Sequence, residues 1–109
     1  MRMWMVDPAK MCGDHLRGEH VELHMFLGIM KKKYKVDGFI KNNLLEIKAM
    51  NERHEALVKE MEKRNWKHTT PFHIDENVYG YLPESVINHK IDVKLATEDL
   101  VSRCEYCSK

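Results

Sequence analysis

Glu22 is the carboxylate in this chain whose neighbours best suit acid–base chemistry. On a helix it would share one face with His15, Gly18 and Glu19, which precede it by seven, four and three positions. Gly18 costs roughly 1 kcal/mol relative to alanine in a helix interior, and it leaves bare backbone one turn before Glu22. We therefore expect something to approach the backbone closely at Gly18.

The α-amino group of Met1 is a candidate nucleophile. The reference pKa of such a group is about 7.7–8.0, against about 10.4 for lysine, so roughly a tenth or more of it is free amine at neutral pH. A free amine can form an imine, and Met1 would do so more readily than a lysine. The sequence alone does not bring Met1 to Glu22, and a purely structural role for Glu22 remains open.

His20 and His24 lie four positions apart, a spacing that can chelate zinc on a helix. In the zinc-protease motif a glutamate directly follows the first histidine, whereas Glu22 lies roughly 200° around a helix from His20. Partly exposed or hydrogen-bonded histidines are the simpler interpretation. We expect no metal at this pair.

Cys104 and Cys107 form a lone Cys-x-x-Cys pair near the C-terminus. Zinc or redox use is one interpretation, but without a second such pair, two reduced thiols that cap the last helix are the simpler one. With Cys12 the chain has three cysteines, an odd number that does not indicate the disulfide framework of a secreted protein. We therefore expect free thiols and no cofactor.

The helix that would carry Glu22 is predicted for residues 14–30. Asp14 suits its N-cap, Gly13 can end a short helical turn expected for residues 7–12, and positive charge suits its C-terminus. That charge comes from Lys31, Lys32 and Lys33. The inner face recurs at the helical period and comprises Leu16, Leu23, Phe26, Leu27 and Met30.

Two further helices are predicted, for residues 44–65 and 84–104, and the later one is expected to break near Asp92. The inner positions are Ile47, Met50, His54, Leu57, Val58 and Met61 in the first of them, and Ile87, Ile91, Val93, Ala96, Leu100 and Cys104 in the second. Residues 31–43 are expected to form a basic connection. Residues 66–83 are expected to form a loop that packs on the body of the protein.

The composition predicts one all-α domain that spans residues 1–109. With 43% hydrophobic and 32% charged residues, such a chain can bury roughly 60% or more of its unfolded surface. The simplest architecture is a compact unit of three main helices, with the apolar residues 1–6 packed against the first. No apolar run approaches the roughly 20 residues of a transmembrane helix. We therefore expect an intracellular, cytoplasmic monomer without membrane contact.

Positive charge is concentrated in the N-terminal part of the chain. Residues 1–68 contain 14 lysines and arginines against 10 acidic residues, whereas residues 69–109 contain 4 against 7. A basic half favours a polyanionic partner, although a solvated helix surface explains any single cluster as well.

Two segments resemble a known family. Residues 15–23, HLRGEHVEL, with Gly28 at the expected distance, resemble the first helix of the pyrimidine-dimer DNA glycosylase/AP lyase family, of the phage endonuclease V type. Residues 51–55 and 63–66 are similar to the second helix of that family and to the turn that ends it. Residues 69–109 match only loosely.

The resemblance implies roles for particular residues. Glu22 falls on the family's catalytic glutamate, and Met1 falls on its nucleophile, which in the phage enzyme is a threonine exposed by removal of the initiator methionine. Here the bulky Arg2 should keep Met1 in place. Arg2 and His15 would hold a phosphate or the surroundings of the amine, and the bare backbone of Gly18 would admit the substrate.

The activity that the resemblance implies is excision of UV-damaged bases from double-stranded DNA, followed by cleavage at the abasic site, without a metal or other cofactor. The amine would attack C1′, displace the base and leave an imine, and β-elimination would then cut the strand. Glu22 would stabilise the oxocarbenium-like sugar and move protons. Location would follow the DNA, at the nucleoid. The basic residues expected to contact DNA are Lys31, Lys32, Lys33, Lys63 and Arg64.

Val21 and Met25 depart from the family pattern, because they stand where its first helix has basic residues that hold DNA phosphates. We therefore expect a different affinity or lesion range. Two other classes of function remain open. One is a small zinc-binding helical protein that uses Cys104 and Cys107 with histidines, and the other is a helical DNA-binding or interaction module without catalysis.

Overall fold

The computed structural model describes residues 1–67 and 70–108, and it confirms the all-α prediction. Helices contain 59% of these residues, and none of them lies in a strand. The three long helices are α1 (Gly13–Lys31), α3 (Met50–Lys63) and α6 (Val93–Arg103). The short ones are η1 (Pro8–Lys10), α2 (Asp37–Lys41), η2 (Ile47–Ala49), α4 (Glu76–Tyr79) and α5 (Glu84–Ile87). Within the described ranges, no helix is both long enough and apolar enough to span a bilayer.

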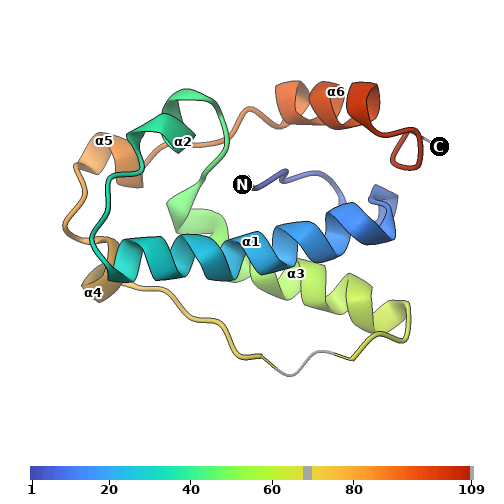
Figure 1. The fold of residues 1–109 in the computed structure, drawn as a ribbon, viewed down its shortest axis with the longest axis horizontal. Coiled ribbons are helices and arrows are strands. Elements are labelled where there is room, and N and C mark those ends of the chain that lie inside the picture. The colour runs from blue at the N-terminus through green and yellow to red at the C-terminus, as the bar shows by residue number, and fades with distance from the viewer. Residues whose placement is uncertain (68–69, 109) are drawn as a thin grey trace.

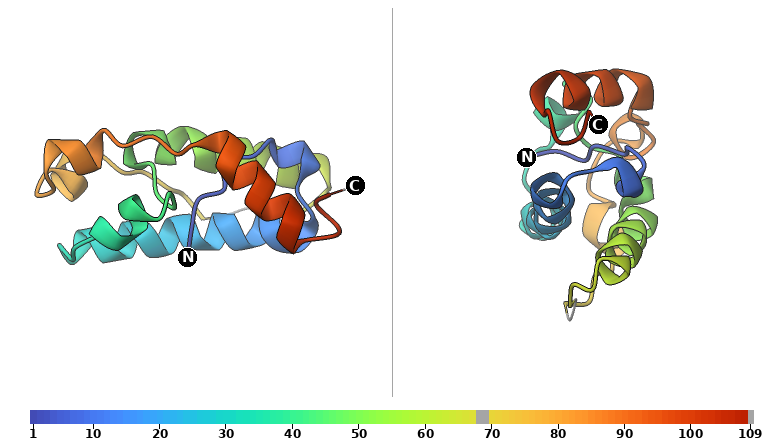
Figure 2. Two further views of the ribbon diagram at one scale, coloured as in Figure 1. Left: turned by 90° about the horizontal axis from the view of Figure 1, so that it is seen from above. Right: turned by 90° about the vertical axis from the view of Figure 1, so that its right-hand side faces the viewer.

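The long helices form a small stack with the N-terminal segment inside it. α1 and α3 lie side by side and run in opposite directions, and α6 lies above them (Figure 1). Figure 2 shows that the N-terminal segment passes between α6 and the pair formed by α1 and α3. The loop that follows α6 returns to the start of α1 in both figures. The expected packing of the N-terminal segment against the first helix is confirmed.

α1 confirms the predicted first helix but has a different N-cap. Cys12 takes this position, since its Sγ accepts the N–H of His15 at 3.5 Å. Asp14 lies instead in the first turn, where its negative charge suits the helix dipole. Four of the five predicted inner residues are fully buried, and Leu27 is partly exposed.

The helix predicted for residues 44–65 is shorter than expected. Residues 44–46 lie outside any helix, η2 follows as a 3-10 turn, and α3 begins only at Met50. The carbonyl of Leu44 accepts the N–H of Met3 at 2.7 Å, so it is engaged by the N-terminal segment rather than by a helix. All six predicted inner residues are nevertheless buried.

The helix predicted for residues 84–104 is two helices, α5 and α6, and the break near Asp92 is confirmed. The Asp92 carboxylate caps α6 by accepting the N–H of Leu95 at 3.1 Å. The break changes the inward face: Val86 is buried and Ile87 only partly so. The prediction of Val93 as an inner residue is wrong, because it begins α6 on the outer side and is 45% exposed.

Both connections contain short helices that the sequence pattern did not predict. α2 lies within residues 31–43 and partly buries Phe39 and Ile40. α4 lies within residues 66–83 and is capped by the Asp75 carboxylate, which accepts the N–H of Asn77 at 3.0 Å. Residues 68 and 69 of that connection lie outside the described residues.

Glu19 of α1 and Arg53 of α3 form an ion pair that is buried in the core. Glu19 is fully buried and Arg53 is 6% exposed. Arg53 Nε and Nη2 donate to the two Glu19 carboxylate oxygens at 2.6 and 2.8 Å, and Nη1 donates to the Val6 carbonyl at 2.8 Å. The pair therefore ties α1, α3 and the N-terminal segment together, which gives Glu19 a structural role.

Replacing Arg53 with methionine is expected to lower the free energy of unfolding by about 3–5 kcal/mol, because the Glu19 carboxylate then lies buried without its partner. Urea denaturation measures the change. The double variant Glu19→Gln/Arg53→Met should recover part of the loss, since it removes the buried charge as well. If the Arg53→Met chain unfolds at the same urea concentration as the native chain, the ion pair contributes nothing to the free energy of unfolding.

Candidate active site

The core holds the first residues of the chain in place. Met3, Trp4 and Val6 are at most 5% exposed. Besides the bond from Met3 to Leu44, the Met3 sulfur accepts the N–H of Glu46 at 3.4 Å. The prediction of an anchored N-terminus is confirmed, and these contacts determine where Met1 lies over α1.

The α-amino group of Met1 and the carboxylate of Glu22 are in contact. Met1 N lies 3.5 Å from Glu22 Oε1, and the backbone N–H of Arg2 donates to the same oxygen at 2.9 Å. The Met1 and Glu22 side chains are 16% and 25% exposed, so both residues reach the surface of the protein. The structure thus brings together the two groups that the sequence could not place relative to one another.

Gly18 lies beside the other oxygen of this carboxylate. A Cβ built on Gly18 would meet only Glu22 Oε2, at the ordinary contact distance of 3.7 Å. The fold itself therefore has room for a larger residue at this position. The space over Gly18 is free for another molecule, which agrees with the expectation of a close approach there.

Arg2 is positioned by two internal partners. Its Nη1 lies 2.6 Å from Asp99 Oδ2 of α6, and its guanidinium lies 3.6 Å from the centroid of the Trp4 ring. Asp99 also pairs with Arg103, at 2.9 Å. The sequence analysis missed Asp99, which follows Arg2 by 97 positions and lies in no local pattern with it. A contact between Arg2 and DNA phosphate stays a prediction.

His15 contacts the Trp4 ring, as Arg2 does. Its ring meets the Trp4 ring edge-on, with the centroids 5.6 Å apart. Its Nδ1 faces two cysteines, at 3.1 Å from Cys12 Sγ and 3.6 Å from Cys107 Sγ. The structure therefore places this predicted site residue with the thiols.

An amine beside a carboxylate can carry out nucleophilic chemistry. Glu22 can accept a proton from Met1, which leaves the neutral amine that attacks carbon. The same negative charge can stabilise a positive charge that develops on a bound sugar. Imine formation with a sugar, helped by a carboxylate, is within the reach of this arrangement.

A family model described as pyrimidine dimer DNA glycosylase matches residues 1–74. The chain belongs to this family. The match includes Met1, Glu22 and the helices α1 and α3, whereas α5, α6 and the Cys104–Cys107 pair lie beyond it. Membership in the pyrimidine dimer DNA glycosylases implies a DNA glycosylase with DNA as its substrate. Searches among curated proteins and among solved structures found no match.

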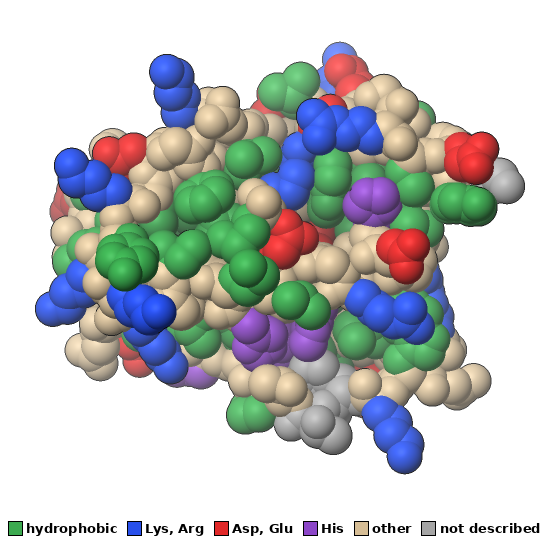
Figure 3. All heavy atoms as spheres, in the orientation of Figure 1, with side chains coloured by type: hydrophobic (Ala, Val, Ile, Leu, Met, Phe, Trp, Pro, Cys, Tyr) green, Lys and Arg blue, Asp and Glu red, His purple; other side chains and the backbone are tan. Residues whose placement is uncertain are grey.

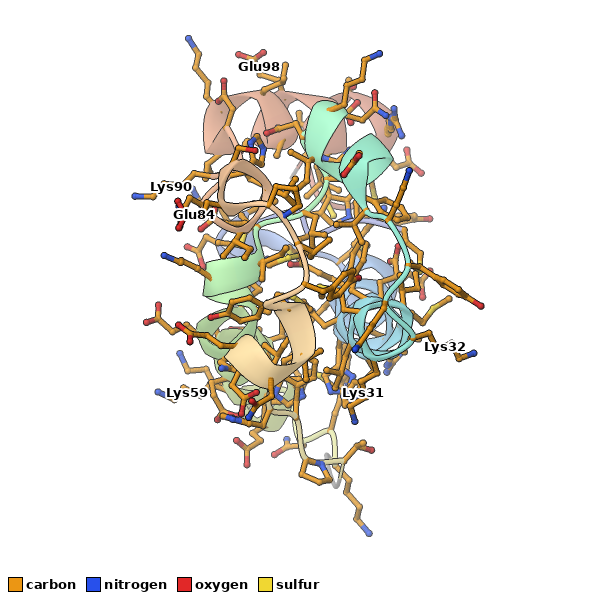
Figure 4. The ribbon with its side chains drawn as sticks, turned by 90° about the vertical axis from the view of Figure 1, so that its left-hand side faces the viewer. Lys31, Lys32, Lys59, Glu84, Lys90 and Glu98 are labelled. Carbon is orange, nitrogen blue, oxygen red and sulfur yellow. The ribbon has the colours of Figure 1, made fainter. Side chains whose placement is uncertain are left out.

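The lysines predicted to contact DNA lie at helix ends. Lys31, Lys32 and Lys33 are exposed at the end of α1, and Lys63 is exposed at the end of α3. Figure 4 shows the side chain of Lys32 projecting away from the body of the protein. Lys31 follows Glu22 by nine helical residues, or about 13 Å along the axis. A duplex bound at Glu22 can span this distance. A contact between these lysines and DNA stays a prediction.

Arg64 is more engaged than these lysines. Its Nε donates to Glu60 Oε2 at 2.8 Å, and its Nη2 donates to the carbonyl of Met11 at 2.7 Å. These contacts link the end of α3 to the segment before α1. A contact between Arg64 and DNA stays a prediction.

Apolar side chains gather on the face that carries Met1 and Glu22. Figure 3 shows hydrophobic side chains across the middle of this face, with basic side chains spread around its edge. On α1, Val21 and Met25 are 53% and 49% exposed. These are the positions at which the family resemblance leads one to expect basic residues.

Three histidines meet between α1 and α3. His20 and His24, the pair singled out by spacing, lie with their ring centroids 5.1 Å apart, and the ring of His54 lies 4.9 Å from His20 and 5.3 Å from His24. Phe72 stacks on His54 at 4.8 Å. Sequence spacing found two members of this cluster, and the third joins them through the packing of α3 on α1.

The three cysteines meet at the other end of α1, and all are free thiols. Cys12 Sγ lies 3.8 Å from Cys104 Sγ, and the backbone N–H of Cys12 donates to Cys107 Sγ at 3.2 Å. A hydrogen bond from the backbone of Cys107 lowers the pKa of the Cys104 thiol, whereas burial raises the pKa of the Cys107 thiol to about 12. Cys104 is also the C-cap of α6, as expected for a thiol at the end of the last helix.

Proposed function

We propose that the protein excises pyrimidine-dimer bases from double-stranded DNA and then cleaves the abasic site as an AP lyase. Family membership supports the glycosylase, and the 3.5 Å separation between Met1 N and Glu22 Oε1 supports the imine chemistry most directly. The enzyme would act as a monomer on DNA in the cytoplasm, and its chemistry at Met1 and Glu22 would use no cofactor.

The first step would exchange the damaged base for the amine. Glu22 takes a proton from Met1, and the nitrogen lone pair forms a bond to C1′ while the bond between C1′ and the base breaks. The base leaves with the bonding electrons and is protonated. The Glu22 carboxylate would stabilise the oxocarbenium-like sugar between these events.

The second step would cut the strand. Opening of the sugar ring gives an imine between Met1 and C1′, and the imine makes the C2′ proton acidic. Removal of that proton by a base breaks the bond between C3′ and its oxygen, so the 3′ phosphate leaves with the electrons. Water then hydrolyses the imine and returns the amine.

Borohydride trapping on abasic duplex DNA tests this function, because borohydride reduces the C=N bond of an imine to a stable amine. We expect one covalent adduct per chain when the protein with its own Met1 is incubated with abasic DNA and borohydride. If bases are excised but no adduct forms, water attacks C1′ directly and the imine mechanism is wrong. If the protein neither excises the base nor cleaves the strand, it is a non-catalytic binding module.

Gly18→Ala is expected to slow excision and strand cleavage roughly tenfold or more, because the added methyl group fills the space through which a sugar would approach Glu22. Stability should rise by up to about 1 kcal/mol, since alanine suits a helix better than glycine does. Single-turnover kinetics and urea denaturation measure the two effects.

Gly28→Ala is the matched control, because Gly28 also lies within α1 and a Cβ there would meet nothing within 4 Å. It should gain similar stability and keep full activity. Equal activity of both variants would show that no substrate passes over Gly18.

A further inference from the structure

Four ligating side chains meet where the loop after α6 reaches the start of α1. They are Cys12, His15, Cys104 and Cys107, whose Sγ and ring nitrogen atoms all lie within 4.8 Å of one another. Two of them come from the N-terminus of α1 and two from the end of α6 and the turn beyond it. The four residues form two pairs with equal spacing, Cys-x-x-His and Cys-x-x-Cys.

Two of the distances between these atoms match those around a tetrahedral zinc ion. Bonds of about 2.3 Å to sulfur and about 2.0–2.1 Å to nitrogen place two sulfurs about 3.8 Å apart, and a sulfur and a nitrogen about 3.5 Å apart. The separation of Cys12 Sγ and Cys104 Sγ is 3.8 Å, and that of Cys107 Sγ and His15 Nδ1 is 3.6 Å. The contact of Cys12 Sγ with His15 Nδ1 is shorter, at 3.1 Å, and needs a small outward shift of the ring.

Two backbone N–H groups donate to the sulfur atoms of this cluster. The backbone N–H of Cys12 donates to Cys107 Sγ at 3.2 Å, and the N–H of His15 donates to Cys12 Sγ at 3.5 Å. Such hydrogen bonds stabilise thiolates and orient them around a metal. The edge-on contact with Trp4 likewise fixes the plane of the His15 ring.

A metal at this site would stabilise the packing of α6 on the rest of the protein. α6 has 11 residues and buries only Ala96 and Leu100 along its length. Helices of this length are marginal on their own and depend on packing. A metal with ligands at the start of α1 and at the end of α6 would hold these two helix ends together, and so support the pairing of Asp99 with Arg2.

We propose that Cys12, His15, Cys104 and Cys107 bind one structural zinc ion. Three thiolates and one imidazole in a tetrahedral set favour zinc over harder divalent cations such as Mg²⁺ or Ca²⁺. Four protein ligands leave no open position for a substrate, so the site is structural and closed. This proposal does not depend on the DNA chemistry at Met1 and Glu22.

Cobalt absorption on the native chain tests the site without any substitution. The reduced protein, stripped of metal with a chelator and titrated with Co²⁺, should give an intense thiolate-to-cobalt charge-transfer band that saturates at one ion per chain. Zinc should displace the cobalt. Absence of this band in the reduced chain would overturn the proposal.

Elemental analysis and thermal unfolding provide the second measurement. The purified native chain should carry zinc, and chelation should lower its Tm by about 10 °C or more. Cys107→Ser should hold one zinc ion fewer than the native chain and lack the cobalt band. His24→Asn, which alters the histidine cluster, should keep the band. Unchanged zinc content in Cys107→Ser, or iron in place of zinc in the native chain, would count against the proposal.

Discussion

Glu22→Gln is expected to lower the rate of base excision by about a thousandfold or more while leaving the fold and DNA binding intact. Glutamine has nearly the same shape, and its side-chain oxygen can still accept the Arg2 N–H that Glu22 Oε1 accepts at 2.9 Å. The substitution removes the negative charge that would stabilise the oxocarbenium-like sugar and take the proton of Met1. Single-turnover excision from a duplex that carries one pyrimidine dimer measures the loss.

Glu84→Gln is the control for this substitution. Glu84 is exposed on α5, and its side chain points away from the body of the protein in Figure 4. The control should excise dimers at the native rate. Near-normal excision by the purified Glu22→Gln chain would remove Glu22 from the mechanism, and normal DNA binding by both chains would exclude misfolding as the cause of a loss.

The parts of the fold that the sequence predicts well are those specified by local signals. α1 has an apolar repeat, a glycine at its start and lysines at its end, so its bounds and most of its inner face follow from residues within it. The inner face of α3 follows from its periodicity in the same way. Neither prediction requires knowledge of what packs against the helix.

The boundaries that the sequence misses are set by distant residues. α3 begins late because Leu44 is engaged by Met3, some forty positions earlier. The Leu44 contact overrides local helix propensity and leaves no mark in the segment itself. The break before α6, which the sequence does predict near Asp92, is also held by distant residues: Asn43 Oδ1 accepts the N–H of Asp92 at 2.7 Å, and Glu46 Oε1 accepts the N–H of Ile91 at 2.8 Å.

The candidate sites divide in the same manner. The pairing of Met1 with Glu22 followed from a family resemblance, because spacing alone cannot join an amine to a carboxylate 21 positions away. The cysteine cluster, by contrast, had a local signal that was overlooked. Cys12 and His15 have the same spacing as Cys104 and Cys107. The sequence analysis favoured simple thiols because it found no second Cys-x-x-Cys pair, and Cys12 with His15 can serve as that second pair of ligands.

An N-terminal extension of one residue is expected to lower the yield of the borohydride-trapped adduct by about a hundredfold or more, without unfolding the protein. The extension converts the Met1 amine into an amide, which is not nucleophilic, and places the new terminus about 3.5 Å farther along the chain. Reacting atoms must lie roughly 3–3.5 Å apart for efficient attack. The fold has no slack to restore that distance, since Arg2 is held by Glu22 and Met3 by Leu44.

Two measurements make this prediction specific. Tryptic mass spectrometry of the trapped native chain should place the DNA remnant on the Met1-Arg2 peptide, and protease removal of the extra residue should restore trapping. N-terminal acetylation, which adds no residue, should abolish trapping as the extension does. If the adduct maps to a lysine such as Lys31, or the extended chain traps as well as the native one, the amine of Met1 is not the nucleophile. Glu22 would then serve a different attacking group, and the contact between Met1 and Glu22 would serve only to anchor the N-terminus.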